Sequence, residues 1–324
     1  MAVFYRAMRA VFLDYDTVSQ GDLDPSGLRA AMPALELRGT TGEEHIDAAI
    51  GDAEIVLLNK LQLGRERLRR ASRLRLIALA ATGTDNVDLG AAAEFGIGVC
   101  NVRGYCTASV TQHVWGMILY LTQRLPEYRR IAVDGSWSGS AQFTMLSLPI
   151  RELAGRTLGI VGWGELGRGV AAAGAAFGMR VLVANRPGGP PQADRPDLEE
   201  LLARADVVSL HCPLTPATRG IIDARRLALM KPDALLINTA RGGLVDGHAL
   251  AAALRAGRLG GAGIDVLASE PPVDGDPLLD PAIPNLLVTP HVAWAAREAR
   301  QRCIDMMADN VRDFLAGGRL GRVV

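Results

Sequence analysis

The chain has 324 residues, of which 49% are hydrophobic and 5% aromatic, and this length suits about two domains. Lys and Arg together number 35, as do Asp and Glu, so the formal net charge is zero. A balanced charge gives no overall attraction for nucleic acid or for an anionic membrane surface, so the sequence predicts neither as a partner.

Three features of the sequence indicate a cytoplasmic protein. The first sixteen residues lack a long apolar run followed by a small-residue cleavage site, so we expect no secretory signal. Residues 107–123 carry no Asp, Glu, Lys or Arg but include Thr, Ser, Gln and His, which favours a buried helix over a membrane span. The cysteines show neither Cys-x-x-Cys spacing nor a histidine pattern for zinc, so we expect free thiols and no metal site; they are Cys100, Cys106, Cys212 and Cys303.

Short apolar runs alternate with amphipathic stretches along the whole chain. Because these runs are almost wholly apolar, they resemble strands that helices cover on both faces. The alternation predicts an α/β fold with two doubly wound parallel sheets, Rossmann-like or flavodoxin-like. The first series of predicted strands is 9–16, 53–60, 74–83 and 98–101, and the second is 157–164, 180–187, 206–213, 234–241, 260–267 and 285–291.

A helix is predicted between the two series, with Thr107 as its N-cap. Its apolar stripe has helical spacing and comprises Val110, Val114, Met117, Leu121 and Leu125. Two alternatives stay open for this helix: it bridges the domains and supplies a dimer interface, or it is buried within one domain.

The domain assignment depends on where the last helix packs. We assign residues 1–105 to a substrate domain that is completed by a C-terminal helix, 296–324, folded back onto it. Residues 106–295 then form the dinucleotide-binding domain. Periodicity alone leaves this return of the last helix undecided.

The strongest local signal is the segment GWGELG, which follows an apolar run and opens an Ala-rich helix. Gly162 would allow the tight turn, Gly164 would let the backbone approach a pyrophosphate, and Gly167 would let the helix pack on the strand. Glu165 and Leu166 begin the helix, whose free N–H groups and positive dipole end suit a phosphate. The sequence therefore predicts a nicotinamide dinucleotide site.

The cofactor preference is predicted from the end of the next strand. An enzyme that prefers NAD usually has a carboxylate there for the ribose 2′-hydroxyl. This chain has Asn185 followed by Arg186. An amide does not repel a 2′-phosphate and a guanidinium can bind one, so we expect NADPH to be favoured. The alternative is that Arg186 stacks on adenine or faces solvent.

Three later segments each place a polar residue near a strand end, where an open α/β sheet binds its ligands. Reduction of a keto acid needs a fixed cation for the carboxylate and carbonyl, and a proton donor for the developing alkoxide. Arg241 can provide the first through a bidentate contact. His291 can provide the second, because imidazole exchanges a proton near neutral pH, and Glu270 beside it would favour the imidazolium.

Each of these residues alone has an ordinary alternative. Arg241 could be a helix-cap or surface arginine, Glu270 a loop carboxylate before two prolines, and His291 a structural histidine. Their joint occurrence in this order, downstream of the dinucleotide turn, favours catalysis.

The sequence resembles the D-isomer-specific 2-hydroxyacid dehydrogenase family over nearly its whole length. The matching segments are GIVGWGELG, HCPLTPATRGII, MKPDALLINTARGGLVD, GGAGIDVLASEPP and TPHVAW. Within the family it most resembles the glycerate dehydrogenases, also called hydroxypyruvate reductases, through residues 57–60, 81–113 and 291–302. The resemblance implies a homodimer of two-domain subunits with a cleft between the domains, and it gives Arg241, Glu270 and His291 the catalytic roles argued above.

The resemblance also implies further site residues. Backbone N–H groups of Thr82 and Gly83 would bind the substrate carboxylate. Lys60 would either reach the substrate hydroxyl or be an ordinary surface lysine. The nicotinamide side would be lined by Cys212, Pro213, Thr239 and Asp265, with Asp265 near the carboxamide.

Three other residues are interpreted more plainly. Trp294 either shapes the pocket or belongs to the core. His113 and His211 are interpreted as structural, because the sequence pairs neither with a carboxylate.

The sequence thus predicts reduction of a small 2-keto acid, hydroxypyruvate or glyoxylate, to the D-2-hydroxy acid. One alternative is a broad 2-keto acid reductase, or one that acts on 2-ketogluconate or phosphoglycerate. A second is a non-catalytic dinucleotide sensor that binds protein partners, which the intact Arg–Glu–His set disfavours.

Overall fold

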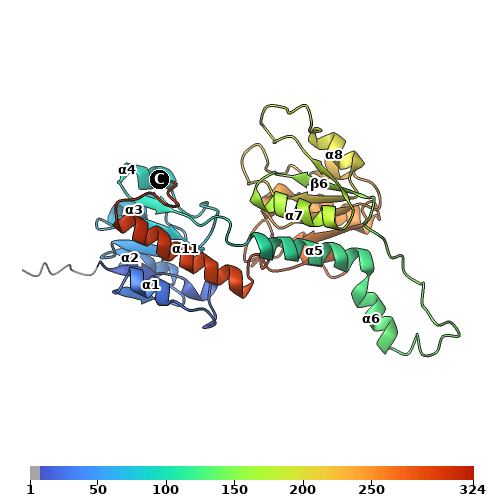
Figure 1. The fold of residues 1–324 in the computed structure, drawn as a ribbon, viewed down its shortest axis with the longest axis horizontal. Coiled ribbons are helices and arrows are strands. Elements are labelled where there is room, and N and C mark those ends of the chain that lie inside the picture. The colour runs from blue at the N-terminus through green and yellow to red at the C-terminus, as the bar shows by residue number, and fades with distance from the viewer. Residues whose placement is uncertain (1–7) are drawn as a thin grey trace, which may run out of the picture. The chain divides into compact units, whose positions relative to one another are not determined.

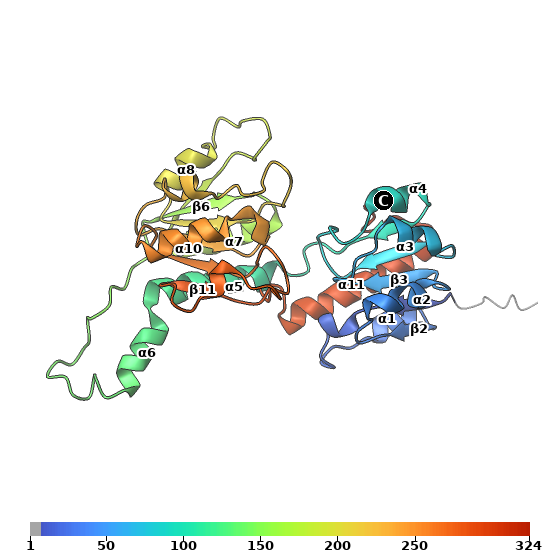
Figure 2. The same cartoon turned by 180° about the vertical axis from the view of Figure 1, so that it is seen from behind.

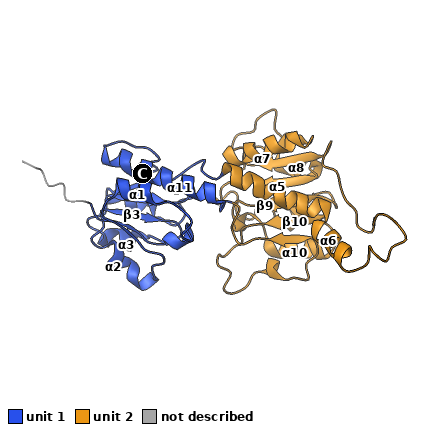
Figure 3. Cartoon of the chain, turned by 60° about the horizontal axis from the view of Figure 1, so that its bottom comes forward, with its two compact units in different colours: residues 1–106, 294–324 blue, residues 107–293 orange. Residues whose placement is uncertain are grey.

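The computed structural model describes residues 8–324; residues 1–7, part of the segment in which no secretory signal is predicted, lie outside the described residues. The chain divides into two compact units (Figure 3). Unit 1 contains the residues up to Cys106 together with Trp294–Val324, and unit 2 contains Thr107–Ala293. Each unit holds one parallel sheet, which confirms the predicted α/β fold.

Unit 1 is built on a five-stranded sheet of order β2-β1-β3-β4-β5, in which every neighbouring pair is parallel. This is the strand order of the flavodoxin-like doubly wound fold. Strands β3 and β4 are buried along their whole length, as their uniformly apolar sequences predict. The strands are β1 (Ala10–Phe12), β2 (Leu35–Leu37), β3 (Ile55–Leu58), β4 (Leu76–Leu79) and β5 (Gly98–Cys100), and the helices are α1 (Ser26–Ala31), α2 (Ile46–Ile50), α3 (Arg65–Arg70), α4 (Leu89–Glu94) and α11 (Arg297–Leu315).

Strand β2 is absent from the sequence-based prediction. It has three residues, lies at the edge of the sheet, and exposes Glu36 while burying Leu35. An edge strand this short needs no continuous apolar run, so its sequence carries almost no strand signal.

The last helix packs within unit 1. Helix α11 lies against α1 and β4, and its Cys303, Ile304 and Met307 are fully buried. Beyond the helix, the final residues pair antiparallel with the outer edge of β5, where the N–H of Val323 donates to the carbonyl of Val99 at 2.8 Å. The C-terminal segment therefore completes both a face and an edge of this unit.

Unit 2 is built on a six-stranded parallel sheet of order β11-β10-β9-β8-β6-β7. The chain turns from β6 to β7 on one side and then crosses to β8 on the other. The point between β6 and β8 is therefore a topological switch, where such sheets bind ligands beyond their carboxyl ends. The strands are β6 (Thr157–Val161), β7 (Arg180–Val183), β8 (Val207–Leu210), β9 (Leu235–Asn238), β10 (Gly261–Ile264) and β11 (Leu286–Val288).

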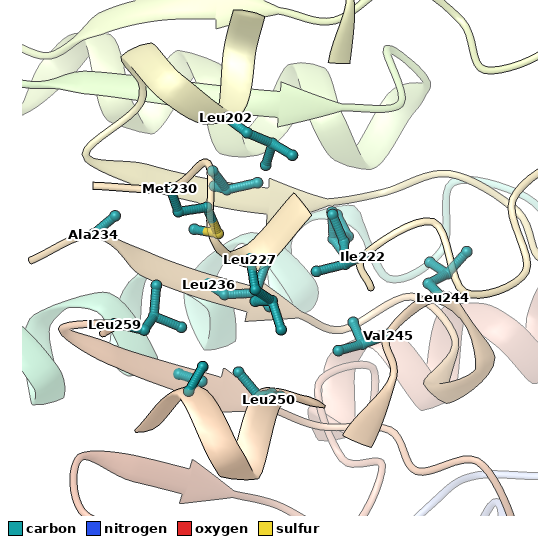
Figure 4. Packing of buried hydrophobic residues seen from close by; sticks show 14 of the residues in the cluster. Leu202, Ile222, Leu227, Met230, Ala234, Leu236, Leu244, Val245, Leu250 and Leu259 are labelled. Atoms are coloured by element: carbon teal, nitrogen blue, oxygen red, sulfur yellow. The ribbon is translucent and has the colours of Figure 1, made fainter. Parts of the chain in front are cut away.

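Helices cover both faces of this sheet. Figure 1 shows α5 (Thr107–Gln123) and α7 (Glu165–Ala176) on one face, and Figure 2 shows α10 (Gly247–Arg255) on the other. Helix α10 packs against α9 (Ala224–Leu227), which in turn contacts α8 (Leu198–Arg204). Between these helices and the sheet lies an apolar core that includes Leu236, Leu250 and Leu259 (Figure 4).

Helix α5 lies wholly in unit 2, where it packs against α7, β9 and β10. The predicted apolar stripe is wrong at its last member. The helix ends at Gln123, Arg124 takes a left-handed conformation with φ 55°, and Leu125 begins the next helix, α6 (Leu125–Val133), with 59% of its surface exposed. The left-handed residue turns the chain, so the helical period does not continue across it.

Among residues 8–324, no helix combines the length and the apolar character needed to cross a membrane. All four cysteines are buried and unbridged. The same residues contain no group of three or more His, Cys, Asp or Glu side chains arranged to hold a metal ion.

Candidate active site

The glycine-rich turn lies at the topological switch of unit 2. Gly162 directly follows β6 and has φ +105°, a region that side chains rarely enter. A Cβ on Gly162 would lie 2.5 Å from the carbonyl carbon of His211 and 2.6 Å from the nitrogen of Cys212, in the loop after β8. Only glycine therefore lets the two loops meet.

The amino end of α7 is suited to a phosphate. A Cβ on Gly167 would lie 2.1 Å from the carbonyl oxygen of Gly162, whereas one on Gly164 would meet nothing within 4 Å. Helices α8, α9 and α10 are each capped by an aspartate side chain, but Gly164 offers none to α7. Within residues 8–324, no acceptor binds the N–H groups of Glu165, Leu166 and Gly167. These donors and the open approach fit a dinucleotide pyrophosphate.

The loop after β7 is held in place by the side chain of one of its own residues, Asn185. The amide of Asn185 donates to the carbonyl of Arg195 at 2.9 Å and accepts the N–H of Gln192 at 2.7 Å. Arg186 is exposed, and its aliphatic stem packs over Gly189. Asn185 thus shapes the loop that carries Arg186.

Three further predicted residues follow β8 and β9. Burial raises the pKa of the Cys212 thiol to about 11, so Cys212 is a neutral, apolar neighbour to the glycine turn. The carbonyl of Pro213 accepts the hydroxyl of Thr218 at 2.7 Å. The hydroxyl of Thr239 is buried and has no hydrogen-bond partner among residues 8–324. A buried hydroxyl without a hydrogen-bond partner is unfavourable unless a bound ligand supplies that partner.

His291 and Glu270 form a close pair. Nδ1 of His291 lies 2.6 Å from Oε2 of Glu270, and Oε1 of the same carboxylate accepts the N–H of Leu267 at 2.8 Å. The histidine side chain is 24% exposed and the glutamate 34%, so both are partly screened from water. The backbone N–H of Leu267 therefore orients the glutamate, and the glutamate orients the imidazole.

The segment that carries His291 is fixed by Asp265, which follows β10 and is 1% exposed. Its carboxylate accepts the hydroxyl of Thr289 at 2.5 Å and the N–H groups of Val292 and Ala293 at 2.9 Å each. Its carbonyl accepts the N–H of His291 at 2.8 Å. These bonds hold His291 in a left-handed conformation, φ 55°, which is uncommon outside glycine.

His113, interpreted from the sequence as structural, lies beside a carboxylate in the structure. Its Nε2 is 3.0 Å from the hydroxyl of Thr289 and 3.5 Å from Oδ1 of Asp265. His113 comes from α5, far from Asp265 in sequence, so no local spacing could have shown the pair.

Arg241 follows β9, the strand next to β10, and begins a short 3-10 turn, Gly242–Leu244. The buried side chain of Asn238 donates to the carbonyl of Arg241 at 2.9 Å, and Nη1 of the arginine donates to the carbonyl of Ala240 at 2.7 Å. Arg241, Glu270 and His291 thus all follow the carboxyl ends of neighbouring strands in one unit.

Unit 1 holds the remaining predicted residues. Lys60 follows β3, and its backbone N–H donates at 2.7 Å to Asp14, a 3% exposed carboxylate that also accepts the N–H of Asn59 at 2.8 Å. Thr82 and Gly83 follow β4, and no acceptor among residues 8–324 binds their N–H groups. Asp14 was not among the site residues predicted from the sequence, although a carboxylate at the end of an apolar run is a visible signal.

His211 gives the stability of the chain a pH dependence. Its Nδ1 is buried without a partner among residues 8–324, and burial lowers the pKa of His211 from 6.5 to about 4. As pH falls, the unfolded chain binds a proton on this histidine before the folded chain does. Stability is therefore retained above about pH 6.5 and declines toward pH 4, and the change from pH 7 to pH 5 should remove about 2 kcal/mol from the free energy of unfolding.

Urea unfolding at the two pH values checks this expectation, with His211→Gln as the matched variant that does not titrate. The wild type should lose more stability than the variant by that amount. Equal losses in the two proteins would show that His211 is protonated as readily in the folded chain as in the unfolded one.

Comparisons with known proteins agree with this geometry. The family model described as D-isomer specific 2-hydroxyacid dehydrogenase, NAD binding domain, matches residues 115–293. A glycerate dehydrogenase of Methylorubrum extorquens is 46% identical over 95% of this chain and 96% of its own length. A hydroxypyruvate reductase of Blautia hydrogenotrophica is 34% identical over 96% of this chain and 98% of its own length.

A solved structure shows the same fold. The crystal structure of the TT0316 protein from Thermus thermophilus matches with a TM-score of 0.84 and 37% identity, covering 98% of this chain and 100% of that one. The matched family model spans the glycine-rich turn and the segments that carry Arg241, Glu270 and His291. The chain therefore belongs to the D-isomer specific 2-hydroxyacid dehydrogenase family, oxidoreductases that act on a CH–OH group with NAD(P).

Proposed function

We propose that this protein reduces a small 2-keto acid, hydroxypyruvate or glyoxylate, to the corresponding D-2-hydroxy acid. The observation that carries the proposal is the 2.6 Å contact between His291 and Glu270, in the same unit as the glycine-rich turn. An imidazole oriented by a carboxylate is a suitable proton donor for a carbonyl that is being reduced.

The proposed roles follow from the geometry of each group. Arg241 binds the substrate carboxylate and polarises the carbonyl. Glu270 fixes Nδ1 of His291, so the proton passes from Nε2 to the carbonyl oxygen. A reduced nicotinamide, when bound by unit 2, would supply the hydride for the carbonyl carbon, which together with the proton from His291 would convert C=O into CH–OH.

The two units have different proposed roles. Unit 2 is the dinucleotide-binding domain, with Cys212, Pro213, Thr239 and Asp265 on the nicotinamide side. Unit 1 is the substrate domain, in which the N–H groups of Thr82 and Gly83 receive the carboxylate. Lys60 supplies a cation from a loop that Asp14 holds in place.

Turnover with a panel of keto acids tests the proposed substrate. The relatives named glycerate dehydrogenase and hydroxypyruvate reductase support hydroxypyruvate. We expect kcat/KM to be highest for hydroxypyruvate and glyoxylate and lower for pyruvate and 2-ketogluconate. If 2-ketogluconate is preferred, the substrate assignment is wrong. If none is reduced while reduced cofactor binds, the chain is a dinucleotide sensor.

We infer that NADPH is preferred over NADH. No carboxylate stands at position 185, and Asn185 holds the loop that presents Arg186. Replacing Arg186 with Gln should lower kcat/KM for NADPH about 10- to 100-fold, because a hydrogen bond to a charged group contributes roughly 1.5–3 kcal/mol. The value for NADH should barely change.

A matched control for that experiment is Arg204→Gln, which removes an exposed arginine of α8 that pairs with Glu200. Arg204→Gln should leave kcat/KM unchanged for both NADPH and NADH. A wild-type preference for NADH, or equal losses with both cofactors in Arg186→Gln, would contradict the proposal.

We propose that the chain forms a homodimer through residues 125–150. Figures 1 and 2 show α6 and the loop after it extending away from the sheet of unit 2. The segment exposes many large apolar side chains, and its length matches the roughly 20–30 residues that each partner gives to a stable interface. The exposed residues are Leu125, Val133, Trp137, Phe143, Leu146 and Ile150.

Sedimentation of a Phe143→Asp, Leu146→Asp variant tests this interface. These side chains are 89% and 82% exposed, so charged replacements disturb no core but would oppose burial against a second copy. We expect a dimer for the wild type and for the control Leu229→Asp, and a monomer for the double variant. A dimer that persists in the double variant would place the interface elsewhere.

A further inference from the structure

The loop after β4 is held by the side chain of Asn101, which was not among the site residues predicted from the sequence. Nδ2 of Asn101, directly after β5, donates to the carbonyl of Thr82 at 2.7 Å. The hydroxyl of Thr82 donates to the carbonyl of Val102 at 2.8 Å. Two bonds thus tie residue 82 to the segment that follows β5.

The bond from Asn101 fixes the direction of a neighbouring N–H. The carbonyl of Thr82 and the N–H of Gly83 belong to one planar peptide, and in a trans peptide these two groups point in opposite directions. With the carbonyl directed at Asn101, the N–H of Gly83 must point away from Asn101. No acceptor among residues 8–324 binds that N–H, so it remains available to an anion.

The burial of Asn101 indicates that its side-chain NH₂ group, which donates to Thr82, is the functional part of this residue. The residue is 4% exposed, and its Oδ1 has no hydrogen-bond partner among residues 8–324. A flipped amide would leave two acceptor oxygens facing each other, so the NH₂ group must face Thr82. A buried amide with half of its capacity unused is unfavourable, which suggests a role beyond stability.

The C-terminal segment fixes Asn101 in turn. The buried amide of Asn310 on α11 donates to the backbone carbonyl of Asn101 at 2.9 Å, and the N–H of Asn101 donates to the carbonyl of Gly321 at 3.0 Å. Neither of these bonds reaches Thr82. Asn310 therefore offers a matched comparison: it steadies the same backbone without touching the peptide in question.

We propose that Asn101 is a positioning residue for the substrate carboxylate, because it turns the N–H of Gly83 toward the anion. The inference rests on the proposed function, in which this N–H group receives the carboxylate of a 2-keto acid. In this proposal, the buried side-chain amide of Asn101 orients the N–H of Gly83 without contacting that N–H group.

Steady-state kinetics with glyoxylate compare Asn101→Ala with Asn310→Ala. Asn101→Ala should raise KM for glyoxylate about tenfold, the value of one hydrogen bond to a charged group, with kcat and the KM of the cofactor little changed. Asn310→Ala should lower thermal stability but leave KM for glyoxylate near the wild-type value. Asn101→Ser serves in the same way if the alanine variant does not fold.

A second readout works without turnover. The amide signal of Gly83 in ¹H–¹⁵N spectra should shift when oxalate is added to the wild type and to Asn310→Ala, but much less in Asn101→Ala. If the wild type reduces no keto acid and yet shows this pattern, the proposed function fails and the role of Asn101 stands. Equal KM values in Asn101→Ala and the wild type, or equal increases in both variants, would overturn the inference.

Discussion

Replacing His291 with Asn is expected to lower kcat for keto acid reduction by about 10²–10⁴, the usual contribution of a general acid. Asn is the informative substitution because His291 has φ 55°, a conformation that Asn tolerates well and Ala does not. The variant therefore keeps the backbone held by Asp265 and removes only the imidazole. Reduced-cofactor affinity, measured by fluorescence titration, should stay nearly unchanged.

Glu270→Gln provides the graded comparison. It keeps an oxygen that can accept a hydrogen bond from Nδ1 of His291 but removes the charge, so its kcat should lie between those of the wild type and His291→Asn. His291→Ala should lower kcat at least as much, but alanine does not tolerate the left-handed conformation, so cofactor affinity is compared in His291→Asn. Loss of cofactor affinity in step with kcat would instead make His291 a structural residue.

Replacing Arg241 with Gln should reduce kcat/KM by about 10²–10⁴, because a bidentate contact provides two hydrogen bonds to a charged carboxylate. Arg241→Lys keeps the positive charge but not the planar pair of donors, so it should recover only a small part of the loss. Initial rates at varied keto acid and saturating cofactor measure both variants.

The control is Arg255→Lys, which alters a surface arginine of the same unit that pairs with Asp280. It should behave as the wild type does. If Arg241→Lys also retains full kcat/KM, the site needs only a positive charge, and the bidentate role of Arg241 is wrong.

The fold was largely predictable because its strands are buried on both faces. Strands such as β3 and β4 are uniformly apolar, so the sequence predicts them without information about their neighbours. The edge strand β2 and the left-handed Arg124 that ends α5 were not predictable, because a half-exposed triplet and a single backbone conformation have no periodic signal.

The candidate site also contains some residues that the sequence could predict and others that it could not. The glycines of the cofactor turn carry their signal locally, since the spacing of Gly162, Gly164 and Gly167 already describes the turn. The residues that support the site carry no such local signal, because Asp14, Asn101 and His113 form hydrogen bonds with residues far from them in sequence. Such partners are set by packing, which one sequence does not record.

The split of unit 1 around unit 2 has a consequence for biosynthesis. A ribosome delivers residues 107–293 as a finished unit while residues 8–106 still lack α11 and the strand-like tail. Until α11 is made, the apolar surface that packs against Met307 is exposed to solvent and the outer edge of β5 is unpaired. Such exposed surfaces favour chaperone binding and strand pairing with other nascent chains. Loss of α11 and of the residues that pair with β5 should therefore disable the part of unit 1 that is made first.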